Sequence, residues 1–211
     1  LDLDAARAVR QFEASNFTFL FAPAYNPAVA HVQPVRKALG IPTIFNTLGP
    51  LLSPGRPSLQ IMGIANPAQG QLIAEVFREL GRERALVVHG AGTDEIASHG
   101  TTQVWELNDG EIVSYELTPE DLGIKRHELT DLVGGDGAAN AQALRAVFAG
   151  HGEPAHCDAI AATAGAMFYL KGTTETIAAG VTHAKELISS GTVEDWLALH
   201  ESTNYAVGEE N

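Results

Sequence analysis

The sequence is short of cysteine, of basic residues and of long apolar runs. Its 211 residues include one cysteine, Cys157, which excludes a disulfide within the chain and a cysteine-rich zinc site. No apolar stretch approaches the ~20 residues that a bilayer-crossing helix needs, and the acidic residues 1–4 do not fit the basic start of a signal peptide. We therefore expect a soluble, cytoplasmic protein in which Cys157 is a buried, reduced thiol.

Positive charge is scarce. The chain has 13 Lys and Arg against 26 Asp and Glu, a formal net charge of −13, and no basic run. Nucleic-acid-binding proteins usually show the opposite sign, so we expect neither a nucleic-acid partner nor a membrane. Hydrophobic residues make up 45% of the chain and charged residues 18%, which predicts a folded core rather than disorder.

Short β-rich apolar runs alternate with helical periods along the chain. The predicted strands are 17–22, 43–45, 59–64 and 85–88, followed by a hairpin of 103–107 and 112–117 around Asp109-Gly110, while 49–57 is predicted to be a turn. The predicted helices are 4–13, 28–39, 66–80 and, in the largely helical part after 138, 158–170 and 176–189. This order predicts an α/β fold over residues 1–211, with a mostly parallel central sheet, flanking helices and an attached antiparallel hairpin.

The acidic pair Asp94-Glu95 is the most informative candidate site. It follows a predicted strand through the glycine-containing loop 89–93, and ligands of open α/β sheets bind beyond the carboxyl ends of strands. Two carboxylates ~4 Å apart repel by about 4 kcal/mol near a protein surface, and a hard cation such as Mg²⁺ turns this repulsion into attraction. The alternative is that the two acids open a helix, where they suit its dipole. Taken alone, the dipeptide favours the helix.

Three further segments have both a structural and a functional interpretation. The fork of Arg36 can grip a carboxylate, although Arg36 and Lys37 can equally form a solvated helix face. The polar turn 46–51 can place backbone donors against a flat ligand or simply connect two elements. Gly134-Gly135-Asp136 lacks the lysine and the preceding strand of a phosphate loop, so capping of the next helix by Asp136 is the better interpretation.

Several segments, in this order and at these spacings, resemble the anthranilate phosphoribosyltransferase family. They are 19–23 (FLFAP), 34–36 (PVR), 39–46 (LGIPTIFN), 48–51 (LGPL), 85–90 (ALVVHG), 94–95 (DE), 117–121 (LTPED), 134–136 (GGD) and 140–141 (NA). The resemblance implies the large α/β domain of a nucleoside-phosphorylase-like fold. It also implies transfer of the phosphoribosyl group of phosphoribosyl pyrophosphate (PRPP) to the amine of anthranilate, in tryptophan biosynthesis, by an enzyme that is usually a homodimer.

The same resemblance assigns roles to residues and reverses the local preferences above. Asp94 and Glu95 would hold Mg²⁺ against the pyrophosphate, and Arg36 would contact the anthranilate carboxylate. The turn at Gly49-Pro50 would line the anthranilate channel. Asn26 stands where the family usually has histidine, so it is a further candidate in this channel.

The resemblance also implies that the N-terminal helical domain and the glycine-rich PRPP loop of the family lie upstream of Leu1. We therefore expect the 211-residue chain alone to be inactive. Two alternatives remain. One is a nucleic-acid-binding relative without transferase activity, and the other is a pyrimidine nucleoside phosphorylase, which would use phosphate as its nucleophile.

Overall fold

The computed structural model describes residues 3–27, 31, 32, 34, 38, 40 and 44–206. By their contacts, the residues group into two compact units, one formed by Leu1–Pro57 with His200–Asn211 and the other by Ser58–Leu199. We predicted a single domain over the whole chain; that statement stays a prediction, and each unit is described by itself. No helix within the described ranges is long and apolar enough to cross a membrane.

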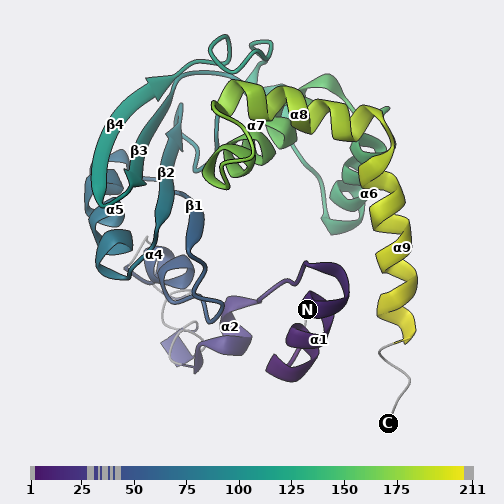
Figure 1. The fold of residues 1–211 in the computed structure, drawn as a ribbon, viewed down its shortest axis with the longest axis horizontal. Coiled ribbons are helices and arrows are strands. Elements are labelled where there is room, and N and C mark those ends of the chain that lie inside the picture. Colours follow the sequence, from purple (N-terminus) through teal and green to yellow (C-terminus); the bar gives the residue numbers. More distant parts are fainter. Residues whose placement is uncertain are drawn as a thin grey trace. The chain divides into compact units, whose positions relative to one another are not determined.

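A four-stranded mixed sheet forms the centre of the second unit (Figure 1). Its strands are β1 (Leu59–Gly63), β2 (Arg84–Gly90), β3 (Thr102–Asn108) and β4 (Glu111–Leu117), in that spatial order. The four strands predicted in this part of the chain are confirmed. The sheet is mixed rather than mostly parallel, because only β1 and β2 run parallel while the other two pairs are antiparallel.

The connections between strands explain these directions. A 3-10 turn η1 (Pro67–Gln69) and helix α5 (Gly70–Glu79) link the parallel pair, as a crossover between parallel strands requires. The β3–β4 hairpin turns at Asp109 and Gly110, whose φ angles of 48° and 81° are those that Asp-Gly was expected to supply. The predicted hairpin is therefore confirmed in both its strands and its turn.

Helices cover both faces of the sheet. Helix α5 packs on one face through Ile73, Ala74 and Phe77, which are all buried. The opposite face is covered by α7 (Pro154–Leu170) and α8 (Ile177–Ser189) (Figure 1). Leu86, Val88 and Val104 pack there in one buried core with small residues of α7 and with Ile177 and Val181 of α8.

Small residues let α7 and α8 touch backbone to backbone. A β-carbon on Gly165 of α7 would collide with the backbone of Gly180 and Val181 of α8, and one on Gly180 would collide with the carbonyl of Gly165. The two helices therefore form one closely packed layer over the sheet. The alanine- and glycine-rich stretch 159–166 was expected to pack closely in this way.

One buried carboxylate ties this layer to the sheet. Glu106 of β3 is 5% exposed and accepts hydrogen bonds from the hydroxyls of Tyr115 on β4 (2.8 Å) and Tyr169 on α7 (2.7 Å). The guanidinium of Arg84 lies 3.5 Å from Glu106 and donates to the carbonyls of Tyr169 and Leu170. Burial and then the charge of Glu106 raise the pKa of Tyr115, so its hydroxyl stays a donor.

The remaining elements that begin in this part of the chain are η2 (Leu129–Leu132), α6 (Gly137–Phe148) and α9 (Thr192–Ala206), whose residues from His200 on are grouped with the first unit. Asp136 caps α6, because its side chain accepts a hydrogen bond from the backbone N–H of Ala139 at 2.9 Å. The capping interpretation of this aspartate is confirmed. The amide of Asn140 closes the preceding turn by accepting from the backbone N–H of Gly135 and donating to its carbonyl.

The first unit contains α1 (Ala5–Ser15), α2 (Ala22–Tyr25) and α4 (Ile44–Leu51). The helix predicted at 4–13 is confirmed as α1, with Asp4 as its N-cap. The strand predicted at 17–22 is wrong: 17–21 have no regular structure, and Ala22 opens α2. The side chains of Phe17 and Phe19 are 54% and 51% exposed, which a strand buried on both faces would not allow.

A second predicted strand, 43–45, is also wrong, because Ile44 and Phe45 open α4. The helix continues through Gly49 and Pro50, so the predicted turn begins only after Leu51. Pro50 has no backbone N–H to donate to the preceding turn, so the last turn of α4 lacks one helical hydrogen bond. The helix predicted over 28–39 lies largely outside the described residues.

Candidate functional site

A cleft of about 970 Å³ opens within the second unit. Its walls are the loop after β2, η2, the turn before α6, and the facing sides of α6 and α7. The lining residues are Thr93, Asp94, Glu95, Ile96, Ala97, His99, Leu129, Leu132, Gly134, Asn140, Ala143, Leu144, Val147, His156, Ala159, Ile160, Thr163, Ala164 and Met167. Both members of the predicted acidic pair are therefore in one concave site, which is the usual setting of a ligand site.

The acidic pair lies on a tight loop beyond the end of β2. The backbones of Gly90 and Thr93 exchange hydrogen bonds of 3.0 and 2.9 Å, and Ala91 and Gly92 between them have positive φ angles. Asp94 and Glu95 follow in irregular structure and are exposed at the cleft. The alternative that they open a helix is therefore wrong.

Two glycines at the ends of parallel strands support this loop. A β-carbon on Gly63, the last residue of β1, would collide with the carbonyl of Asp94. One on Gly90, the last residue of β2, would collide with the carbonyl of Glu95 and with Ala97. The backbone of Asp94 and Glu95 thus packs directly against the C-terminal ends of β1 and β2. This contact fixes the backbone positions from which the two carboxylate side chains extend.

The electrostatics of the pair suit a cation. Partial burial, and then the negative charge of Asp94, raise the pKa of Glu95 above its usual value. A divalent ion beside the pair would offset both effects, because it favours the charged form of each carboxylate. Among the residues that the structure describes, no three His, Cys, Asp or Glu side chains converge on a metal position. Two adjacent carboxylates fit Mg²⁺, which uses one or two protein carboxylates and takes its other oxygens from water and phosphate.

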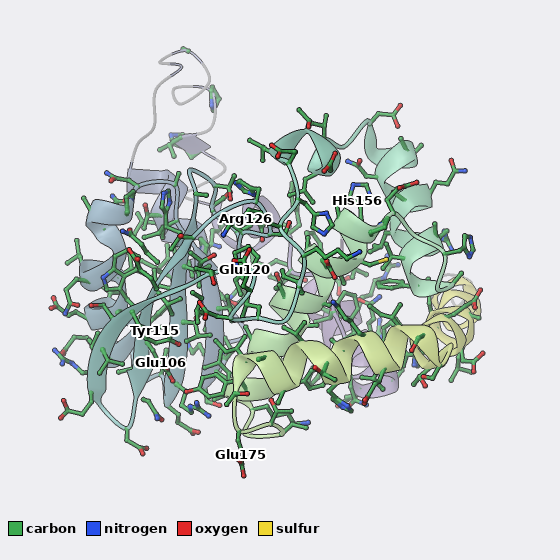
Figure 2. The ribbon with its side chains drawn as sticks, turned by 90° about the horizontal axis from the view of Figure 1, so that it is seen from above. Glu106, Tyr115, Glu120, Arg126, His156 and Glu175 are labelled. Carbon is green, nitrogen blue, oxygen red and sulfur yellow. The ribbon has the colours of Figure 1, made fainter. Side chains whose placement is uncertain are left out.

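Apart from Thr93, Asp94 and Glu95 of the loop after β2, the cleft is mainly apolar, with four polar side chains at its walls. His99, Asn140, His156 and Thr163 line it, and Figure 2 labels His156. We did not predict these residues as site residues. The histidines show no paired spacing in the sequence, and a lone threonine in an alanine-rich helix carries no signal; only Asn140 stood beside a noted motif.

The other predicted site residues belong to the first unit. Asn26 follows α2 and is half-buried, and both its backbone N–H (3.0 Å) and its side-chain amide (3.3 Å) donate to the carbonyl of Ala22. Gly49 and Pro50 lie in the last turn of α4. Arg36 lies outside the described residues. The roles of all four stay predictions.

Cys157 has the features of an unreactive thiol. It is half-buried in α7, and its Sγ lies 3.5 Å from the carbonyl of Gly152. Burial, and then the neighbouring charge of Asp158, raise the pKa of the thiol. A raised pKa disfavours the nucleophilic thiolate, which supports the expectation of an inert cysteine.

Fold and site together define an α/β protein with a candidate cation site beyond the carboxyl ends of parallel strands. The chain belongs to the glycosyl transferase family, because the model of that family's a/b domain matches residues 1–194.

Two relatives show which enzyme the chain resembles. The chain is 78% identical over 205 residues to the anthranilate phosphoribosyltransferase of Corynebacterium aurimucosum, covering 97% of this chain and 59% of that protein. It is 67% identical over 206 residues to the enzyme of the same name from Corynebacterium diphtheriae, covering 98% of this chain and 60% of the relative. The chain therefore spans about three fifths of the length of these relatives.

Solved structures agree. The anthranilate phosphoribosyltransferase of Thermus thermophilus is 38% identical, with a TM-score of 0.83, and the match covers 92% of this chain and 57% of that one. The enzyme from Saccharomyces cerevisiae in complex with PRPP and Mg is 28% identical, with a TM-score of 0.84 and coverage of 94% and 57%. Another structure of the yeast enzyme holds 4-fluoroanthranilate.

Proposed function

We propose that the protein carrying this chain is an anthranilate phosphoribosyltransferase, which transfers the phosphoribosyl group of PRPP to the amine of anthranilate. The observation that carries the proposal is the acidic pair Asp94-Glu95, supported by Gly63 and Gly90 and facing a cleft. The identities of 67–78% to corynebacterial enzymes of this name support the same reaction. The finer fold assignment, a nucleoside-phosphorylase-like large domain, is part of the proposal.

The chemistry fits such a site. The amine nitrogen of anthranilate forms a bond to C1 of the ribose, the bond from C1 to the pyrophosphate oxygen breaks, and the electron pair leaves with pyrophosphate. The amine then loses one proton. A neutral aromatic amine needs no strong general base, so catalysis depends on positioning and on stabilising the charge of the leaving group. Mg²⁺, when bound, neutralises that charge, and Asp94 and Glu95 would hold the ion.

The second substrate is assigned to the first unit. Arg36 would grip the carboxylate of anthranilate through two charge-assisted hydrogen bonds, while Asn26, Gly49 and Pro50 would line its path. We further propose a cytoplasmic homodimer, as the resemblance implies. A nucleic-acid-binding role is disfavoured by the net charge of −13, and a phosphorylase by the relatives described above.

The test uses the full-length form, meaning a chain of the relatives' length that carries these 211 residues. Asp94→Asn with Glu95→Gln should lower kcat/KM at limiting Mg²⁺ by roughly a hundredfold or more, because charge stabilisation is lost. Turnover is followed by the fluorescence of anthranilate.

The matched control is Glu175→Gln. Glu175 is an exposed acid between α7 and α8 that points away into solvent (Figure 2), and its neutralisation should leave turnover unchanged. Equal kinetics for the double variant and this control would remove the acidic pair from the mechanism.

A further inference from the structure

A second charged cluster lies behind the cleft, and the transfer chemistry does not use it. Asp158 of α7 is 8% exposed and contacts two cationic or hydrogen-bonding side chains. Its Oδ1 lies 2.7 Å from Nζ of Lys185 on α8, and its Oδ2 lies 2.8 Å from Nε2 of His127. The backbone N–H of Lys125 also points at Oδ2, at 3.4 Å. The carboxylate of α7 is thus bound from one other helix, α8, and from one loop.

His127 connects this cluster to the loop 91–98, which carries Asp94 and Glu95 and is called the acidic loop below. Its backbone N–H donates to the carbonyl of Ser98 at 2.9 Å, three residues after Glu95. Its side chain is only 11% exposed and binds Asp158, whose helix supplies Ala159, Ile160 and Thr163 to the opposite wall of the cleft. One residue therefore bonds to both walls.

His127 also fixes the third wall. η2 begins two residues later, and its Leu129 and Leu132 line the cleft. Without the bond from His127 to Asp158, the loop before η2 would lose this side-chain hydrogen bond to α7. The distance between the carboxylates and the α7 wall would then no longer be set by a buried bond.

The charge state of Asp158 makes this bond strong. Burial alone would raise the pKa of the carboxyl, but the hydrogen bonds from Lys185 and His127 lower it below its usual value. The group is therefore an acceptor carrying full negative charge, and hydrogen bonds to charged groups are roughly twice as strong as neutral ones.

We propose that His127, held by Asp158 and Lys185, is a positioning residue that braces the acidic loop against α7 and so sets the geometry in which Asp94 and Glu95 receive a metal-bound diphosphate. The proposal rests on the proposed function, because that function places the diphosphate at the acidic pair. Partners that orient ligand-bearing groups from behind commonly change affinity by tenfold or more when they are removed.

The test compares variants of the full-length form by steady-state kinetics at limiting Mg²⁺. His127→Ala should raise the KM for PRPP roughly tenfold, with the KM for anthranilate unchanged and kcat altered by less than about threefold. His127→Gln, whose amide N–H can replace Nε2, should restore most of the loss. A merely structural contact would not separate the two KM values or respond to this rescue.

The matched control is Arg126→Ala. Arg126 is the neighbouring residue, and its guanidinium makes an exposed ion pair with Glu120 at 2.9 Å (Figure 2). Both residues belong to the same connecting segment, so this pair reaches neither α7 nor the acidic loop. The control should leave both KM values unchanged.

The outcomes separate the two proposals. An unchanged KM for PRPP in His127→Ala, while Asp94→Asn raises it, would overturn the brace alone. Unchanged values in both variants would remove the diphosphate site itself. Should His127→Ala fail to fold, Lys185→Met decides: its side chain is 39% exposed, so it should fold, and a KM for PRPP equal to that of the wild type would overturn the proposal.

Discussion

At the scale of single residues, the candidate site depends on two positions without a side chain as much as on the two carboxylates. Gly63 and Gly90 lack side chains where the backbone of the acidic pair passes. Any β-carbon at these positions needs the space of a backbone carbonyl, which cannot rotate away as a flexible side chain can. The position of the carboxylates is therefore determined by two residues that do not themselves line the cleft.

Gly63→Ala tests this dependence. The collision with the Asp94 carbonyl should lower the free energy of unfolding by about 1–3 kcal/mol, the usual cost of overpacking, and should raise the KM for PRPP in the full-length form. Gly55→Ala is the control, because a β-carbon there meets only ordinary contacts with Leu20 and Ser53. Chemical denaturation and kinetics check both variants; equal behaviour of the two would show that the loop adapts freely.

A variant of Arg36 tests the proposed binding of anthranilate. Arg36→Ala should raise the KM for anthranilate roughly tenfold or more, because a bidentate bond to a carboxylate contributes about 1.5–3 kcal/mol. The KM for PRPP should change little. Lys37→Ala is the neighbouring control, and steady-state kinetics with each substrate varied separately measures both. An unaltered KM for anthranilate in Arg36→Ala would exclude the carboxylate clamp.

At the scale of elements, the sequence predicted what short-range chemistry decides. The β3–β4 hairpin was predictable because Asp109-Gly110 suits one turn type. The helical stretch of η1 and α5 was predictable because Asn66-Pro67 starts η1 and the apolar face of α5 follows. The position of Asp94-Glu95 beyond β2 followed from the strand itself. These features need no knowledge of distant contacts.

Elements that depend on distant contacts were not predictable. The run 17–22 has the composition of a strand, but composition does not supply a hydrogen-bonding neighbour, and the short apolar run 43–45 cannot be told from a helix start. His156 and Thr163 enter the cleft only because α7 packs opposite the acidic loop, and His99 enters it from the segment between β2 and β3. The brace of His127 and Asp158 joins residues 31 positions apart, so no local pattern indicates it.

The contact between α7, α8 and the loop before η2 should make stability depend on pH. Because the pKa of Asp158 in the folded state lies below its unfolded value of about 3.8, its carboxylate form favours the folded state. This stabilisation is fully present above about pH 4 and is lost as the pH falls through the lowered pKa.

Asp158→Asn is the corresponding variant. It should lower the free energy of unfolding by about 1.5–3 kcal/mol at neutral pH, because two charge-assisted hydrogen bonds are weakened. The difference from the wild type should shrink as the pH falls below about 4. Urea denaturation across this range measures it, and a difference that is constant with pH would contradict the ionic role of Asp158.

At the scale of the whole molecule, charge decides between the two classes of function. With a net charge of −13, the chain should repel a polyanion and should not bind DNA at physiological salt. A gel-shift assay with random duplex DNA should show no complex at micromolar protein. A salt-sensitive complex would revive the nucleic-acid-binding alternative.

The buried carboxylate of Glu106 also restricts how this chain can fold. Its donors come from three elements, with Arg84 on β2, Tyr115 on β4 and Tyr169 on α7. Figure 2 labels Glu106 and Tyr115. Sliding β3 by one residue would turn Glu106 toward the face that α5 covers and away from these three donors. An ionised carboxylate buried without its partners costs several kcal/mol. The register of β3 against β2, the strand that precedes the acidic loop, is thus favoured by a single side chain.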